Sequence, residues 1–426
     1  MQTTLADFIR NTPEGDEAEA ILRKCVHCGF CTATCPTYQL LGDELDGPRG
    51  RIYLIKQVLE GKPVTEKTQL HLDRCLTCRS CETTCPSGVH YSRLLDIGRE
   101  VVHARVPRSP KERIARTALR NVVTRPTLFG SLLKAGQLAR PALPAILRRK
   151  VPPTIRSPKP RPTTLHARRV LMLEGCVQPS LAPATNAATA RVLDRLGISV
   201  VDAPQAGCCG AVSFHLDERA EALDFMRRNI DAWWPHIEAG AEAIVVTASG
   251  CSVTVKDYEY QLAHDRAYAE KAKRVSELAK DVSEIILAEC DKLVSLIASP
   301  SPAALLPSPP APSSLAPRRI AFHAPCTLQH GLKIRGEIEA LLSSLGFEVV
   351  PVQDAHLCCG SAGTYSILHP ELAGRLLENK VAALTEHAPE EIVTANIGCQ
   401  THIQSGTDVR VRHWIELLDE RLSTRI

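Results

Sequence analysis

Short apolar runs alternate with helical patterns along the second half of the chain. Such runs occur at residues 170–173, 198–201 and 244–246, and again at 320–322, 347–350 and 392–393. Between them, apolar residues recur every three or four positions, as in the segment through Val192 and Leu196. This β-α-β order predicts two small, mostly parallel sheets covered by helices.

The first half of the chain is predicted to be mainly helical. Residues 47–51 read Gly-Pro-Arg-Gly-Arg, which is turn chemistry, and they lead into helical spacing at Ile52, Ile55 and Leu59. Apolar residues recur at helical spacing again between Ile114 and Leu133. The two halves together predict an α+β multidomain protein.

Composition adds one unusual feature, the number of cysteines. A chain of 426 residues has length for about two to four domains. Its 44% apolar and 23% charged residues exclude a wholly disordered or fibrous chain, and a net charge of +4 does not indicate a nucleic-acid partner. Its 17 cysteines form tight clusters, and no secretory signal is visible. These features predict reduced thiolates that ligate metals in the cytoplasm.

Eight cysteines form two copies of one spacing. From Cys25 the chain reads C-V-H-C-G-F-C-T-A-T-C-P, and from Cys75 it reads C-L-T-C-R-S-C-E-T-T-C-P. This C-x2-C-x2-C-x3-C-P spacing is typical of bacterial ferredoxins, in which the fourth cysteine ligates the neighbouring cluster. The sequence therefore predicts two [4Fe–4S] clusters: cluster 1, held by Cys25, Cys28, Cys31 and Cys85, and cluster 2, held by Cys75, Cys78, Cys81 and Cys35.

Other groups fit these motifs less well. Structural zinc sites use cysteine pairs separated by a longer arm, and no C-x-x-C here is followed by the histidine of a c-type haem. Arg49 and Arg51 lie between the motifs, where a positive charge would raise the reduction potential of a cluster. The base rate for arginine favours interpreting both as surface residues.

Eight further cysteines belong to an internal repeat. Cys176, Cys208, Cys209 and Cys251 recur, 150 or 148 residues later, as Cys326, Cys358, Cys359 and Cys399. Each follows a predicted strand, and ligands of open α/β sheets collect at the carboxyl ends of strands. Each repeat is therefore predicted to bind a metal through four soft thiolates, which suit an iron–sulfur cluster or zinc. Cys290 has no counterpart and is interpreted as a packing residue.

Two histidines lie close to the cysteines of the second repeat. His323 and His356 precede Cys326 and Cys358, but the first repeat has leucine and alanine at the corresponding positions. This difference favours structural or solvent-facing histidines over ligands.

A basic arm and a proline-rich segment separate the predicted domains. Between Arg113 and Leu173 there are 14 lysines and arginines and no acidic residue. Such an arm either lies on an anionic membrane or acidic partner, or is a linker wrapped on the protein itself. The predicted divisions are 1–110 for the ferredoxin-type domain, 111–166 for the arm, 167–298 for the first repeat, 299–317 for the proline-rich linker and 318–426 for the second repeat.

These motifs, with Gly-Asp-Glu-Leu-Asp-Gly-Pro-Arg-Gly-Arg at 42–51, resemble the iron–sulfur subunits of bacterial glycolate oxidases over nearly the whole chain. The resemblance implies an electron-transfer subunit without catalytic residues of its own. An FAD-containing catalytic subunit would oxidise glycolate to glyoxylate, and D-lactate to pyruvate, beside a second flavin-binding-type subunit. Electrons would pass towards quinone at the cytoplasmic face of the inner membrane, where the chain would be peripheral.

Two alternatives stay open, because the Cys-Cys-Gly half is shared with other families. One is a disulfide or thiol reductase, as in heterodisulfide reductases. The other is the equivalent subunit of a lactate or glycerol-3-phosphate dehydrogenase. Heterodisulfide reductases end each repeat with C-x-x-C, whereas this chain has Ala248 and Asn396 in place of the first of those cysteines. This departure argues against the non-cubane cluster and the disulfide chemistry of that family.

Overall fold

The computed structural model describes residues 1–144, 148, 151–154, 157–298 and 317–423. The chain forms two compact units. Unit 1 comprises Met1–Thr117, Cys326–Lys333 and Asp354–Ala382, and unit 2 comprises Ala118–Pro325, Ile334–Gln353 and Ala383–Ile426. The linker predicted at 299–317 lies, apart from its last residue, outside the described residues. The predicted α+β architecture is confirmed, because helices fill the N-terminal part and two parallel sheets follow.

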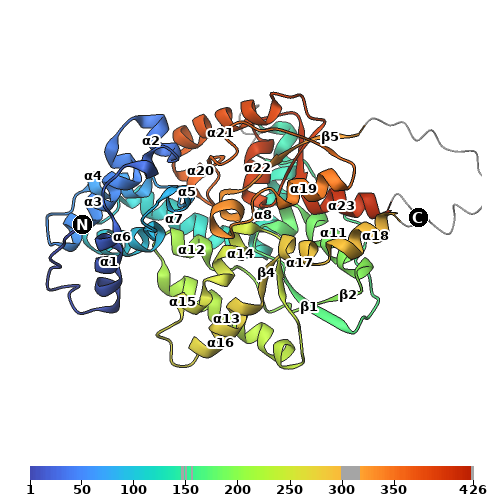
Figure 1. Cartoon of the computed structure of the whole chain (residues 1–426), viewed down its shortest axis with the longest axis horizontal. Coiled ribbons are helices and arrows are strands. Elements are labelled where there is room, and N and C mark those ends of the chain that lie inside the picture. The colour runs from blue at the N-terminus through green and yellow to red at the C-terminus, as the bar shows by residue number, and fades with distance from the viewer. Residues whose placement is uncertain (145–147, 149–150, 155–156, 299–316, 424–426) are drawn as a thin grey trace, which may run out of the picture. The chain divides into compact units, whose positions relative to one another are not determined.

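Unit 1 is built from short helices around the two cysteine motifs, and its N-terminal part is drawn in blue in Figure 1. Their bounds are α1 Pro13–Lys24, η1 Phe30–Thr32, α2 Pro36–Leu41, η2 Glu44–Asp46, α3 Pro48–Leu59, α4 Glu66–Asp73, α5 Ser80–Thr84, α6 Tyr91–Arg105, η5 Thr327–Gly331 and α20 Tyr365–Leu368. Proline begins α1, α2 and α3, where its missing N–H has no intrahelical acceptor. Leu22, Ile55 and Leu94 are fully buried in the core, so the predicted helix through Ile55 is confirmed.

Both sheets lie in unit 2. The first contains β1 Arg168–Leu173, β2 Ile198–Val201, β3 Ile244–Val246 and β4 Ala279–Asp281 in the order β2-β1-β3-β4. The second contains β5 Arg319–His323, β6 Glu348–Val350, β7 Glu391–Thr394 and β8 Arg410–His413 in the order β6-β5-β7-β8. All pairs are parallel, and Leu171 opposite Ile244 corresponds to Ala321 opposite Ile392. The sequence repeat is therefore also a repeat of topology.

Helices cover the strands of unit 2, whose central residues are buried. Their bounds are α8 Pro126–Ala139, η3 Arg140–Ala142, α10 Gln178–Leu181, α11 Pro183–Arg195, α12 Ala211–His215, α13 Arg219–Glu238, α14 Ser249–Lys256, α15 Tyr258–Gln261, α16 Ala269–Leu278, α17 Val282–Ala288, α18 Cys290–Ala298, α19 Glu337–Ser344, α22 Ile397–Gln404 and α23 Trp414–Ser423. Two further helices, α7 Pro110–Val123 and α21 Pro370–Thr385, run from one unit into the other. Helix α11 packs on α23, and Arg191 donates to Asp419 at 2.6 Å across that contact. This contact joins the two repeats.

The basic arm forms the predicted helices α7 and α8, and neither helix buries a residue. Arg120 pairs with Glu218, and Arg161 donates to Glu174 at 2.7 Å. Because these carboxylates belong to the first repeat, the ion pairs favour the interpretation of the arm as a linker wrapped on the protein.

Within the described residues, no helix has the length and apolarity needed to cross a membrane.

Candidate metal centres

The two ferredoxin-type loops share one backbone conformation. His27 and Gly29 have positive φ angles of 57° and 86°, and the corresponding residues Thr77 and Arg79 have 53° and 61°. A positive φ is unfavourable for residues with a side chain, so three of these four positions carry local strain. The same strained path in both loops indicates that the positions of the cysteines depend on it.

The sulfurs of these loops form two groups within unit 1. Cys25, Cys28, Cys31 and Cys85 line one cavity. Cys35, Cys75, Cys78 and Cys81 line a second cavity, and Cys81 also borders the first. In each group, three cysteines come from one motif and the fourth comes from the other motif.

The electrostatics of these thiols test whether the cavities suit a metal cluster. Burial raises the pKa of Cys31 to about 11 and raises the pKa of Cys25 above its ordinary value. Burial also raises the pKa values of Cys78 and Cys81 well above the ordinary range. Thiols held this way ionise only beside a compensating cation, which a metal centre supplies. The donor set therefore fits a thiolate-ligated cluster.

The cysteines predicted to hold cluster 2 have polar neighbours that the sequence did not reveal. Tyr91 is buried, and its hydroxyl donates to Cys75 Sγ at 3.6 Å. Thr37 Oγ1 lies 3.3 Å from Cys35 Sγ. Arg51, interpreted from the sequence as a surface residue, is only 1% exposed, so that interpretation is wrong. Its guanidinium donates to Asp46 on η2 and to the carbonyl of His71 on α4. No local sequence pattern encodes these contacts.

The first repeat brings its four cysteines together. Cys176 follows β1, Cys208 and Cys209 follow β2, and Cys251 lies in the first turn of α14, after β3. Hydrogen bonds join Cys176 to Cys208, Cys208 to Cys209, and Cys209 to Cys251. The bond to Cys208, together with burial, raises the pKa of Cys176 well above its ordinary value. Four soft donors thus meet at the carboxyl edge of the sheet, as expected for a metal site.

Two buried residues fix the backbone of this Cys-Cys-Gly loop. Asn229 Nδ2 donates to the carbonyl of Cys208 at 2.9 Å, and its Oδ1 accepts from the N–H of Gly207 at 2.9 Å. The Tyr258 hydroxyl donates to the carbonyl of Cys209 at 2.9 Å. Sequence reasoning missed both residues, because a polar residue on an otherwise apolar helix face gives no sign of its partner.

The cysteines of the second repeat that precede α21 lie in unit 1. Cys326 is hydrogen-bonded to Cys358, and Cys358 to Cys359. Cys78, a predicted ligand of cluster 2, lies close to them: burial, followed by electrostatic repulsion from Cys326, raises the pKa of Cys78. A ligand predicted for cluster 2 is therefore an electrostatic neighbour of the second repeat.

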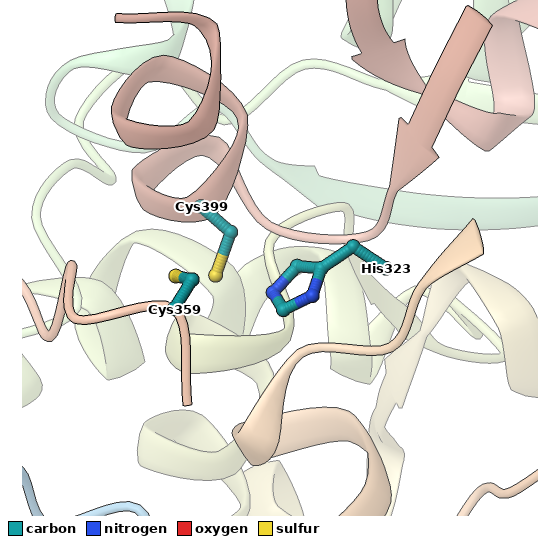
Figure 2. Close-up of side chains that lie close together, drawn as sticks. All are labelled: His323, Cys359 and Cys399. Carbon is teal, nitrogen blue, oxygen red and sulfur yellow. The ribbon is translucent and has the colours of Figure 1, made fainter. Parts of the chain in front are cut away.

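Cys399 lies in unit 2, beside a histidine. Figure 2 shows the side chains of His323 and Cys399 pointing towards one another, and their ligand atoms lie within 4.8 Å. Asn396 Nδ2 donates to Cys399 Sγ at 3.6 Å, and Asn396 Oδ1 accepts from the N–H of Gly250 at 3.3 Å. His323 is buried and thus not solvent-facing, whereas His356 is half-buried. Of the two expected alternatives, structural or solvent-facing, His323 therefore fits only the structural one, as the last residue of β5.

Both halves of the chain match known protein families. Residues 21–89 match the family described as "4Fe-4S dicluster domain", and residues 170–256 and 320–404 match "Cysteine-rich domain". The chain is 57% identical to the glycolate oxidase iron–sulfur subunit of Escherichia coli K12, over 99% of each chain. It is 32% identical to a probable glycolate oxidase iron–sulfur subunit of Bacillus subtilis, over 95% of this chain and 94% of the relative. It is 27% identical to lactate utilization protein A of Geobacillus thermodenitrificans, over 55% of this chain and 91% of the relative.

Proposed function

Since the chain belongs to the family of glycolate oxidase iron–sulfur subunits, we propose that it carries electrons within a complex that oxidises glycolate. A partner subunit with FAD oxidises glycolate to glyoxylate, and D-lactate to pyruvate, and a second flavin-binding-type subunit completes the complex. The chain passes the electrons towards quinone, as a peripheral protein at the cytoplasmic face of the inner membrane. The two groups of four cysteines in unit 1 carry this proposal.

The cysteines have the roles that electron transfer requires. Cys25, Cys28, Cys31 and Cys85 hold cluster 1, and Cys35, Cys75, Cys78 and Cys81 hold cluster 2. Such clusters exchange one electron at a time, whereas oxidation of an alcohol releases two. The sequence contains no dinucleotide fingerprint that would hold a flavin or nicotinamide. The two-electron step is therefore assigned to the partner, and this chain takes the electrons singly.

The repeats are proposed as further metal centres. In the first repeat, Cys176, Cys208, Cys209 and Cys251 are the donors, and their soft sulfurs suit an iron–sulfur cluster or zinc. The sequence correspondence assigns the same roles in the second repeat to Cys326, Cys358, Cys359 and Cys399. The repeat relation supports this assignment, since equivalent cysteines follow equivalent strands.

The disulfide-reductase alternative is less well supported. The position that carries a further cysteine in heterodisulfide reductases is Asn396 here, and its amide donates to Cys399 Sγ. The lactate alternative rests on relatives that match only about half of the chain, such as lactate utilization protein A over 55%. Glycolate is therefore the substrate that we propose for the complex.

The proposal is tested on the complex purified anaerobically with its partner subunits. Cys28→Ser removes one predicted ligand of cluster 1, so we expect a loss of about four irons. One reduced-state EPR signal and the glycolate-dependent reduction of a quinone analogue should be lost with them. Cys290→Ser is the matched control, because Cys290 belongs to neither motif nor repeat, and it should keep all three properties. Full activity in Cys28→Ser would overturn the relay.

A further inference from the structure

Arg51 is a buried cation at the wall of the cluster 2 cavity. It lines that cavity together with Cys35 and Cys75. Its Nε donates to the carbonyl of His71 at 2.7 Å, and its Nη1 donates to Thr37 Oγ1 at 3.1 Å. The guanidinium is thus fixed against the cluster ligands from two sides. Because arginine does not lose its proton in proteins, this charge is permanent.

The charges around Arg51 do not cancel. Asp46 is fully buried, and its carboxylate accepts from Arg51 at 3.4 Å and from Arg74 at 2.8 Å. Two arginines therefore share one carboxylate, which leaves an excess positive charge. Arg99 adds another cation on this side, since its Nη2 donates to the carbonyl of Cys75 at 2.9 Å. In a buried site such a charge is weakly screened and acts strongly on its neighbours.

Cluster 1 has a different arginine beside it. Arg49 lines the cluster 1 cavity, but its side chain is 35% exposed. Its Nε and Nη2 donate to both carboxylate oxygens of Glu44, at 2.6 and 3.0 Å. This pair is neutral overall and in contact with water, so its field at the cluster is weak.

We propose that Arg51 raises the reduction potential of cluster 2, with Asp46 partly offsetting its effect. Reduction adds one electron to a centre that already carries four thiolates, and no bond is made or broken. A fixed buried cation stabilises that added charge, and net charge is one of the factors that set cluster potentials. Arg51 thereby makes cluster 2 an electron acceptor within the chain. This inference rests on the proposed ligands of cluster 2.

The test is an EPR-monitored redox titration of the full chain in the anaerobic complex. Arg51→Gln removes the cation, and we expect one of the two cluster potentials to shift to a more negative value. Asp46→Asn removes the opposing carboxylate and should shift the same potential to a more positive value. Arg49→Gln, at the solvent-exposed pair, is the matched control and should shift either potential by much less than Arg51→Gln does.

Opposite shifts of the potential in the two variants distinguish electrostatic tuning from structural damage. The shift caused by structural damage would not reverse its sign between the two variants. Unmoved potentials in Arg51→Gln with full iron content, or shifts of the same sign in both variants, would overturn the inference. If Arg51→Gln fails to keep its iron, Asp46→Asn decides alone, and the absence of a positive shift overturns the inference. Failure of the proposed function looks different, because the unaltered complex would then lack either the two [4Fe–4S] signals or the glycolate-dependent reduction of a quinone analogue.

Discussion

At the scale of single residues, the glycine after each pair of vicinal cysteines is required by the backbone. Gly210 has a φ of 96°, and a Cβ there would lie 2.9 Å from the carbonyl oxygen of Ala222. Gly360 has a φ of 90°, and a Cβ there would lie 2.9 Å from the carbonyl oxygen of Ala373. In both repeats a long helix, α13 or α21, thus packs directly on the glycine.

This contact predicts the effect of adding a methyl group. Gly210→Ala should lower the free energy of unfolding by about 2–3 kcal/mol, because backbone strain and a clash with a rigid carbonyl act together. Gly240→Ala is the matched control: its φ is 91°, but no atom lies within 4 Å of the added carbon. It should cost about 1 kcal/mol, from backbone strain alone. Urea unfolding of the two variants checks this, and equal losses would contradict it.

The residues that could be predicted from the sequence are those whose role follows from spacing. The ferredoxin-type cysteines and the repeat cysteines are of this kind, since each group has a fixed interval. Arg51, Asn229 and Tyr258 could not be predicted, because their roles depend on partners distant in the chain. Arginine is usually exposed, and only the packing of η2 and α4 around Arg51 makes it a buried charge.

At the scale of elements, six strands of the two sheets could be predicted and the other two could not. The six predicted strands are β1, β2, β3, β5, β6 and β7, all rich in apolar residues. Strands β4 and β8 read Ala-Lys-Asp and Arg-Val-Arg-His, and lie at the edges of their sheets. The charged residues of these two strands mask the apolar pattern, so local reasoning does not detect them. The edge strands β2 and β6 keep an apolar run and could be predicted.

The junction between β8 and α23 contains a buried histidine that makes stability depend on pH. Burial lowers the pKa of His413 to about 3, and its Nδ1 accepts from the N–H of Ile415 at 3.2 Å. The unfolded chain binds a proton at this residue below about pH 6.5, whereas the folded chain does not until about pH 3. Stability therefore falls as the pH decreases through this window, by about 1.4 kcal/mol per unit.

A histidine variant isolates this contribution. In His413→Asn, the side-chain oxygen can still accept from Ile415, but the residue no longer titrates. We expect a smaller loss of stability between pH 7.5 and 5.5 than in the unaltered chain, by about 1 kcal/mol. Urea unfolding at several pH values measures the slope, and the exposed His264→Asn is the control. Identical slopes in His413→Asn and the unaltered chain would contradict the assignment.

At the scale of the whole molecule, chain order does not follow the compact units. The strands of the second repeat lie in unit 2, but two of its cysteine-bearing loops lie in unit 1 with the ferredoxin-type motifs. The Tyr365 hydroxyl donates to the carbonyl of Arg74 at 3.1 Å, and Thr83 Oγ1 lies 2.9 Å from His330 Nδ1. The sequence predicts five successive segments, and no local signal indicates that loops of the last one belong with the first.

This arrangement predicts that the second repeat influences cluster 2. A metal ion held by three or four thiolates carries net negative charge, and Cys326 and Cys358 lie close enough to Cys78 to interact with it electrostatically. Cys326→Ser should empty the site and leave neutral thiols, so the potential of cluster 2 should rise, on the order of tens of millivolts. Cys326→Ser should leave the potential of cluster 1 unchanged. The control Cys290→Ser should change neither potential. An EPR-monitored titration of the anaerobic complex measures both potentials. If the potential of cluster 2 stayed unchanged or became more negative, the second repeat would hold no charged centre beside it.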